Sequence, residues 1–192
     1  MNEQPARRLI LASGSPRRRE LLGRMGYIFD VCAPEVDEHV PGHPRDIVRI
    51  LSERKARAAA LNVPRDAVIV ASDTLVSLNG IPLGKPGDTG EARKMLRSLS
   101  GVRHEVYTGV CVLDNSNGRL ESRVVCTGVR FRPIDDAEID AYIATGEPMD
   151  KAGAYAIQGG ASHFVEGLEG SFDNVVGFPT DEVRQMLADF GL

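Results

Sequence analysis

The sequence predicts an α/β protein built on a mixed β-sheet. In the first half of the chain, short apolar runs rich in β-branched residues alternate with amphipathic segments, a pattern typical of strands joined by helices. In the middle, two long strand-like segments, 104–114 and 119–132, follow one another across a turn sequence at 115–118, which predicts an antiparallel pair. No repeat or long linker interrupts the 192 residues. We therefore expect one domain over 1–192, with room for two lobes around a cleft.

Three strands and two helices are predicted in the first half. The strands cover 8–12, 27–32 and 67–78, and the helices cover 16–25 and 46–61. For the first helix, Ser15 is a suitable N-cap and Pro16 a suitable first residue. Asn79-Gly80, directly after the third strand, is typical of a type I′ hairpin turn.

The second half is predicted to carry three more helices. They cover 89–99, 135–145 and 180–190. Thr89 and Thr180 are the expected N-caps of the first and last of these helices. The segment 151–160 is small and glycine-rich, and 171–179 is predicted to contain a short strand.

Charge and cysteine content exclude several classes of protein. The net charge is −4 and the isoelectric point is near 5.6, so no global basic field is available for nucleic acid. The cysteines Cys32, Cys111 and Cys126 form no C-x-x-C pair, which argues against a zinc site or a disulfide framework. We expect buried free thiols, although Cys111 and Cys126 could face each other across a hairpin. No apolar run suits a signal peptide or a membrane span, so a cytoplasmic protein is expected.

A cluster of cations lies where the first helix is predicted to begin. Arg17, Arg18 and Arg19 directly follow a small polar turn, and the unpaired N–H groups and dipole of a helix N-terminus favour anions. Cations there oppose the dipole, so three arginines suit a bound polyanion better than they suit helix stability. The alternative is that Arg18 and Arg19 are solvated surface side chains. The P-loop pattern is absent.

Asp73 is the second candidate for chemistry. It interrupts an apolar strand, between Ser72 and Thr74, where an unpaired carboxylate would be costly. A metal-binding or general-base carboxylate is the favoured interpretation, and a buried cap on a nearby loop is the alternative.

Other acids and lysines complete a set suited to phosphate chemistry. The acidic stretch 35–38, which includes Glu38, could share a divalent cation with Asp73, because hard cations prefer carboxylate oxygens. Lys55, Lys85 and Lys151 could neutralise phosphates. Carboxylates for a metal combined with several cations are typical of phosphoryl or nucleotidyl transfer. The four histidines show no metal-ligand spacing and are interpreted as surface or packing residues.

Four long motifs resemble the Maf family of nucleoside triphosphate pyrophosphatases. They are LASGSPRRRELL (11–22), ASDTLVSLNGIPLGKP (71–86), LSGVRHEVYTGV (99–110) and KAGAYAIQGGASHFVEGLEGSFDNVVGFP (151–179). The resemblance implies hydrolysis of a nucleoside triphosphate between the α and β phosphates, with a divalent metal, Mg²⁺ or Mn²⁺. It also implies an elongated, two-lobed fold with a curved mixed sheet, similar to inosine triphosphatase, and a homodimer.

The resemblance assigns roles to individual residues. Asp73 matches the family's proton acceptor, and Arg17, Thr74 and Gln158 match positions that select the substrate. The remaining matches would hold the triphosphate or the metal: Ser13, Glu38, Lys55 and Lys85. Arg18, a member of the arginine cluster, is also expected to bind the substrate. Among them, Lys55 and Lys85 are expected to assist catalysis, and Glu38 to share the metal with Asp73.

The segment around Gln158 resembles the subgroup that acts on dTTP and UTP, and not the subgroup that acts on 7-methyl-GTP. A glutamine amide can match O4 and N3–H of uracil or thymine. Phe178 and His163 depart from the family pattern. Modified pyrimidine nucleotides are further candidate substrates. A nucleotidyltransferase and a nucleotide-binding regulator of cell division and septum formation are the alternative functions.

Overall fold

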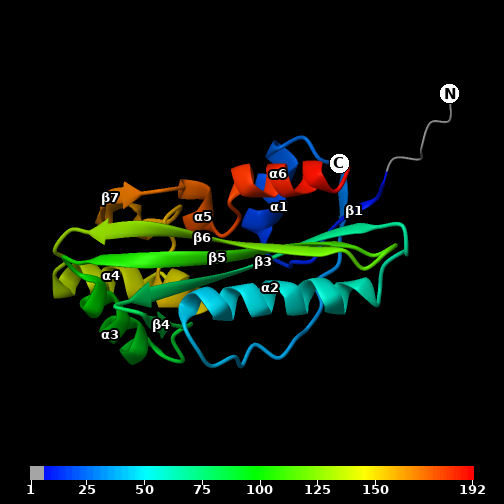
Figure 1. Ribbon diagram of the computed structural model, residues 1–192. Helices are drawn as coiled ribbons and strands as arrows, with labels where there is room; N and C mark the ends of the chain where they lie inside the picture. The colour runs from blue at the N-terminus through cyan, green and yellow to red at the C-terminus, as the bar shows by residue number, and fades with distance from the viewer. Residues whose placement is uncertain (1–6) are drawn as a thin grey trace.

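The computed structural model describes residues 7–192 and contains one twisted, open sheet flanked by helices (Figure 1). The strands are β1 (Leu9–Leu11), β2 (Phe29–Val31), β3 (Val68–Leu78), β4 (Ile81–Leu83), β5 (Arg103–Asp114), β6 (Leu120–Phe131) and β7 (Val165–Glu169). Their order is β2-β1-β3-β5-β6-β7, with β4 paired to β3. β1 runs parallel to β2 and β3, and the other pairs are antiparallel. The predicted α/β class with a mixed sheet is confirmed.

Helices lie on both faces of this sheet and at its far end (Figure 1). The α-helices are α1 (Pro16–Arg24), α2 (Pro44–Ala60), α3 (Thr89–Leu99), α4 (Asp136–Ala144), α5 (Phe172–Val176) and α6 (Thr180–Asp189). Three short 3-10 helices follow α4: η1 (Glu147–Asp150), η2 (Ala152–Ala154) and η3 (Gly160–Phe164). Helix α2 runs along one face of the sheet, and α1, α5 and α6 lie on the other. Helices α3 and α4 pack against each other near the end of the sheet where β5 begins and β6 ends. No helix in this part of the chain is long and apolar enough to cross a membrane.

Helices α3 and α6 begin at Thr89 and Thr180 as predicted, but their N-caps lie one residue earlier than expected. Asp88 caps α3 by accepting a hydrogen bond from the Glu91 N–H, so Thr89 is the first helical residue and not the cap. Pro179, not Thr180, is the N-cap of α6. The Thr180 hydroxyl instead donates to Asp173, at 2.6 Å. A carboxylate one residue earlier outcompetes a threonine as a cap for α3.

One helix start and one strand also differ from the prediction. α2 begins at Pro44, with the His43 side chain as its cap, and not at Asp46. The strand expected over 27–32 is shortened to β2. Ser15 is the N-cap of α1 as predicted, although its side chain makes no capping hydrogen bond.

The strand predicted within 171–179 is wrong. Residues 172–176 form helix α5, capped by the Ser171 hydroxyl, which accepts from the Asn174 N–H, and closed by Gly177 in the left-handed region. The strand of this region, β7, lies earlier and pairs with β6. Val175 and Val176 are typical of a strand, but capping by Ser171 and Gly177 at the two ends stabilises a helix here.

The three cysteines are free, and their exposure differs from the expectation. Cys111 is buried, Cys32 is half-buried and Cys126 is exposed, so buried thiols were correctly expected only for Cys111. Cys111 lies opposite Ser122 and Cys126 opposite Tyr107, so the two thiols do not face each other across the β5–β6 hairpin.

Gly109 allows α2 to approach the sheet closely. It lies opposite Asp73 on β3, and a Cβ atom at position 109 would stand 2.2 Å from the Val48 carbonyl oxygen. That neighbour is backbone and cannot rotate away. The contact therefore sets the distance between α2 and the middle of the sheet.

We expect Gly109→Ala to destabilise the protein by about 3 kcal/mol, because the helix must move away from the strand. Urea unfolding at neutral pH measures the change. Gly167→Ala is the matched control, since a Cβ atom there meets its nearest neighbour at 3.9 Å. Equal stability of the two variants would contradict the argument.

His104 on β5 is a buried neutral side chain. Its Nε2 lies 2.8 Å from the Tyr155 hydroxyl, and its ring packs edge-on against Phe131. Burial lowers the pKa of His104 to about 4, whereas the unfolded value is about 6.5. The unfolded chain therefore binds the proton first as the pH falls.

The stability contributed by neutral His104 should be complete above pH 6.5 and lost as the pH falls toward 4. The expected loss from His104 between pH 7 and pH 4.5 is about 2.5 kcal/mol. Urea unfolding at the two pH values tests this, and His104→Phe should reduce the pH dependence by that amount. His163→Gln, at an exposed position, should keep the parent's pH dependence. An unchanged pH dependence in His104→Phe would contradict the prediction.

Candidate functional site

A cavity of about 1050 Å³ collects most of the residues that the sequence analysis singled out. The turn before α1, the loop after β2, helix α2, strand β3 and the segments around Lys85, Tyr155 and Val176 all contribute to its wall. The predicted site residues that line it are Ser13, Arg17, Arg18, Glu38, Lys55, Asp73, Thr74 and Lys85. Residues far apart in the chain are therefore brought to one place by the sheet.

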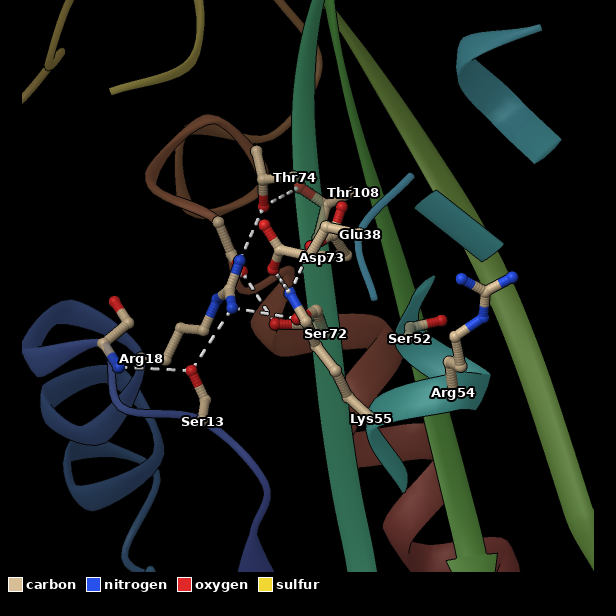
Figure 2. Close-up of polar contacts among 12 residues, drawn as sticks. Ser13, Arg18, Glu38, Ser52, Arg54, Lys55, Ser72, Asp73, Thr74 and Thr108 are labelled. Atoms are coloured by element: carbon tan, nitrogen blue, oxygen red, sulfur yellow. Dashed lines mark hydrogen bonds and ion pairs between the residues drawn. The ribbon is translucent and has the colours of Figure 1, made fainter. Parts of the chain in front are cut away.

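Lys55 joins two carboxylates at the centre of this cavity (Figure 2). Its Nζ lies 2.6 Å from Asp73 Oδ1 and 2.8 Å from Glu38 Oε1. The side chains of Lys55 and Asp73 are only 14% and 12% exposed, so this contact is shielded from water, whereas Glu38 is 56% exposed. The hydrogen bond from Lys55 lowers the pKa of Glu38, with help from the charges of Lys85 and Arg18. Glu38 is therefore a carboxylate at neutral pH.

The other acids of the loop before α2 point elsewhere. The Asp37 carboxylate accepts a hydrogen bond from the His39 N–H, at 2.9 Å, and neither Glu35 nor Asp37 lines the cavity. Only Glu38 of the acidic stretch joins Asp73.

Arg18 connects three elements of the fold rather than reaching freely into the cavity (Figure 2). Its Nε donates to the Gly177 carbonyl at 3.0 Å, and one terminal nitrogen donates to the Ser72 carbonyl at 2.8 Å and to Ser13 Oγ at 3.2 Å. The other terminal nitrogen donates to Thr74 Oγ1 at 3.1 Å. Burial lowers the pKa of Arg18, and the charge of Asp73 partly offsets this. Four of its five N–H groups are therefore used within the protein.

The direction of the hydrogen bonds at Thr74 follows from its neighbours. Thr108 donates its hydroxyl proton to the Asn174 carbonyl, at 2.9 Å. Thr74 must therefore donate to Thr108 across 3.0 Å, while it accepts from Arg18. The Thr74 hydroxyl can offer a ligand a lone pair but no proton.

Arg17 and Lys85 are the cavity cations whose charges remain available. Within residues 7–192, the side chain of neither residue makes a hydrogen bond or an ion pair with another group. Arg17 is half-buried and Lys85 is exposed at the cavity wall. Lys151, also in the wall, is paired with Asp150. The expected cationic cluster is thus present, and Arg17 and Lys85 are its free members.

Gln158 is not part of the cavity wall. Tyr155, Ala156 and Ile157 line the cavity, and Gln158 follows them as an exposed residue. Its placement beside the lining residues is compatible with a contact to a ligand that extends beyond the wall.

The donor set at Asp73 and Glu38 fits a hard divalent cation. Mg²⁺ is commonly held by one or two carboxylates together with substrate phosphates, and not by a complete protein cage. Two carboxylates are what this cavity provides, and residues 7–192 contain no group of three or more candidate ligands.

Sequence reasoning missed Thr108 and Asn174. Asn174 is fully buried, and its amide donates to the Val106 carbonyl and to Thr127 Oγ1, which ties α5 to β5 and β6. Asn174 follows Asp173 in the sequence, so its burial left no signal there, and the incorrect strand prediction obscured its role further. Thr108 could be found only from its register opposite Thr74.

Comparisons with known proteins identify the family of this chain. The family model described as Maf-like protein matches residues 8–190. A dTTP/UTP pyrophosphatase of Anaeromyxobacter dehalogenans is 53% identical over 190 residues, which cover 97% of this chain and 95% of the relative. Proteins of the same name from Geobacter sulfurreducens (50% identity; 96% and 97% covered) and Pelotomaculum thermopropionicum (48%; 95% and 96%) are also similar.

Among solved structures, the Ham1 protein of Staphylococcus aureus covers 65% of this chain and 71% of its own, with a TM-score of 0.45 and 13% identity. The names of the sequence relatives support the predicted enzyme class, a hydrolase of nucleoside triphosphates. Because the family model spans nearly all of the described residues, the chain belongs to the Maf-like protein family, as its motifs predicted.

Proposed function

We propose that the protein is a pyrophosphatase that hydrolyses dTTP and UTP to the monophosphate and pyrophosphate. The observation that carries this proposal is the Asp73–Lys55–Glu38 cluster, placed in the same cavity as the free cations Arg17 and Lys85. Carboxylates beside a cationic wall match what phosphoryl transfer requires. The names of the relatives supply the substrates.

The cations would bind the triphosphate. Arg17 offers a planar set of donors suited to phosphate oxygens, and Lys85 offers a mobile point charge. Lys55 and the N-terminus of α1, beside Ser13, add positive potential at the wall. Charge that develops on the leaving pyrophosphate would be stabilised by these groups. Arg18 would hold the wall in shape and offer one remaining N–H group.

Asp73 would act as the general base. Its Oδ1 is bound to Lys55, which leaves Oδ2 to accept a proton from the water that attacks the α phosphorus. Lys55 keeps the carboxylate in position, because the ammonium is nearly enclosed. Asp73 and Glu38 would also hold a divalent cation, Mg²⁺ or Mn²⁺. When bound, such a cation neutralises phosphate charge.

Thr74 and Gln158 would contribute to the choice of base. The Gln158 amide offers one acceptor and two donors, which can match N3–H and O4 of thymine or uracil. Thr74, which has no proton to donate, would accept from a ligand donor. Modified pyrimidine nucleotides with the same edge are further candidate substrates.

We also propose that residues 1–192 act as one Maf-like domain, with two lobes around the cavity, in a cytoplasmic homodimer that binds neither nucleic acid nor membrane. The three free thiols favour a reducing compartment, and the net charge of −4 disfavours binding to a polyanionic backbone.

Asp73→Asn should lower kcat for dTTP by about 10²- to 10⁴-fold, because the amide cannot accept the proton from water. Pyrophosphate release measures the effect. Asp37→Asn is the matched control, since Asp37 is an acid near the site that does not line the cavity. It should keep parental turnover. If Asp73→Asn folds and retains a tenth of the parental kcat, Asp73 is not the base.

The substrate proposal predicts pyrophosphate release from dTTP and UTP, and little from CTP, GTP, ATP or 7-methyl-GTP. The panel is measured with Mg²⁺ or Mn²⁺. A chelator should stop the reaction, because without a divalent cation the negative phosphates would be repelled by the carboxylates of Asp73 and Glu38. Release from 7-methyl-GTP alone would overturn the choice of base. Formation of a new ester with an acceptor would indicate a nucleotidyltransferase, and tight binding without turnover would indicate a regulator.

A further inference from the structure

The turn that carries Gln158 is a defined structure at the edge of the cavity. The Gly159 N–H donates to the Ala156 carbonyl at 3.0 Å, which places Ile157 and Gln158 at the two central positions of a β-turn. Ile157 lines the cavity and Gln158 is exposed next to it. Any shift of this turn would therefore move Gln158 relative to the cavity.

Tyr142 on α4 holds the first residue of the turn. Its hydroxyl oxygen accepts a hydrogen bond from the Ala156 N–H at 3.1 Å. The Tyr142 side chain is almost fully buried, and its ring packs edge-on against Phe164 with the centroids 5.5 Å apart. Burial raises the pKa of Tyr142, so the hydroxyl stays neutral. The oxygen that fixes Ala156 is itself fixed by packing.

Glu147, the first residue of η1, holds the other end. Its Oε2 accepts a hydrogen bond from the Gly160 N–H at 2.8 Å. The carboxylate also lies against the backbone of Gly159, because a Cβ atom at that position would stand 1.7 Å from Oε1. The two glycines therefore leave the space that the carboxylate occupies. Glu147 therefore contacts the backbone of the turn and not one of its side chains.

Both contacts come from one stretch of chain, the end of α4 and the start of η1. Within residues 7–192, they are the hydrogen bonds that tie the backbone of 156–160 to elements outside the turn and the following η3. The remaining hydrogen bonds of this backbone are local. The position of the Gln158 turn thus depends on Tyr142 and Glu147.

We propose that Tyr142 and Glu147 are positioning residues that set the choice of pyrimidine by holding the Gln158 turn. This rests on the proposed function. An amide distinguishes uracil from cytosine only if its donor and acceptor are held in place. In cytosine, N3 is an acceptor where uracil has the N3–H donor, and the amino group at C4 is a donor where uracil has the O4 acceptor. A loose turn lets the amide rotate and accept either base. Arg17 and Lys85, the proposed phosphate ligands, belong to other segments of the cavity wall than this turn.

The experiment compares kcat/KM for dTTP with kcat/KM for CTP in a set of variants. Glu147→Ala and Tyr142→Phe each remove one acceptor, and each should lower the ratio by about tenfold, mainly through KM. Glu147→Gln keeps an acceptor for the Gly160 N–H and should restore most of the ratio. Glu166→Ala, an exposed acid on β7, is the control and should match the parent. Thermal unfolding establishes that each variant is folded.

A Gln158→Ala background separates this inference from the proposed function. In that background, Glu147→Ala should cause no further fall in the ratio, because its effect passes through Gln158. If Gln158→Ala lowers the ratio but Glu147→Ala and Tyr142→Phe do not, the positioning role is wrong and the base choice stands. An equal effect of Glu147→Ala with and without Gln158 also overturns the positioning role. If Gln158→Ala leaves the ratio unchanged, or the parent does not discriminate, the proposed base choice fails and the inference with it.

Discussion

Helix α2 can reach Asp73 only because the strand beside it has no side chain at position 109. The Val48 carbonyl occupies the space of the missing Cβ atom, and Gly109 lies directly opposite Asp73 in the sheet. Lys55, one to two turns further along α2, then meets the carboxylate at 2.6 Å. A helix held further away would leave Asp73 as a nearly buried charge without its partner, which is a costly arrangement. The backbone contact and the ion pair therefore depend on each other.

The neighbouring residues Arg17 and Arg18 serve two different purposes. Arg18 uses four of its N–H groups to join the turn before α1, strand β3 and the end of α5. Arg17, one residue earlier, leaves its guanidinium available at the cavity wall. Successive residues of a helix point about 100° apart, so one can face the protein while the next faces a ligand. The cationic motif thus serves both to build the cavity and to bind in it.

Polar contacts from α5 and the residue after it connect the second half of the chain to the cavity wall. Asn174 and Gly177 present backbone carbonyls to Thr108, Ser72 and Arg18. These contacts link a helix of only five residues to the middle of the sheet. A short helix has little stability by itself, so its position depends on these tertiary contacts. This dependence also explains why the sequence prediction failed here. The apolar pair Val175-Val176 is typical of a strand, but the segment is helical because Ser171 and Gly177 cap it and because it packs on the sheet.

The α/β class, the long β5–β6 hairpin and the residue types that line the cavity could be predicted from the sequence alone. An aspartate inside an apolar strand and cations at a helix start are local signals, since each is costly without a partner. Which residues form ion pairs and hydrogen bonds with one another depends on the tertiary structure. Lys55, Glu38 and Asp73 are separated by 17 and 18 residues, and their meeting depends on strand register and on the approach of α2 at Gly109. The different roles of Arg17 and Arg18 likewise depend on the Gly177 carbonyl, which accepts from Arg18 and lies more than 150 residues away in the sequence. Such contacts leave no local pattern, because their energy is gained only when distant segments pack together.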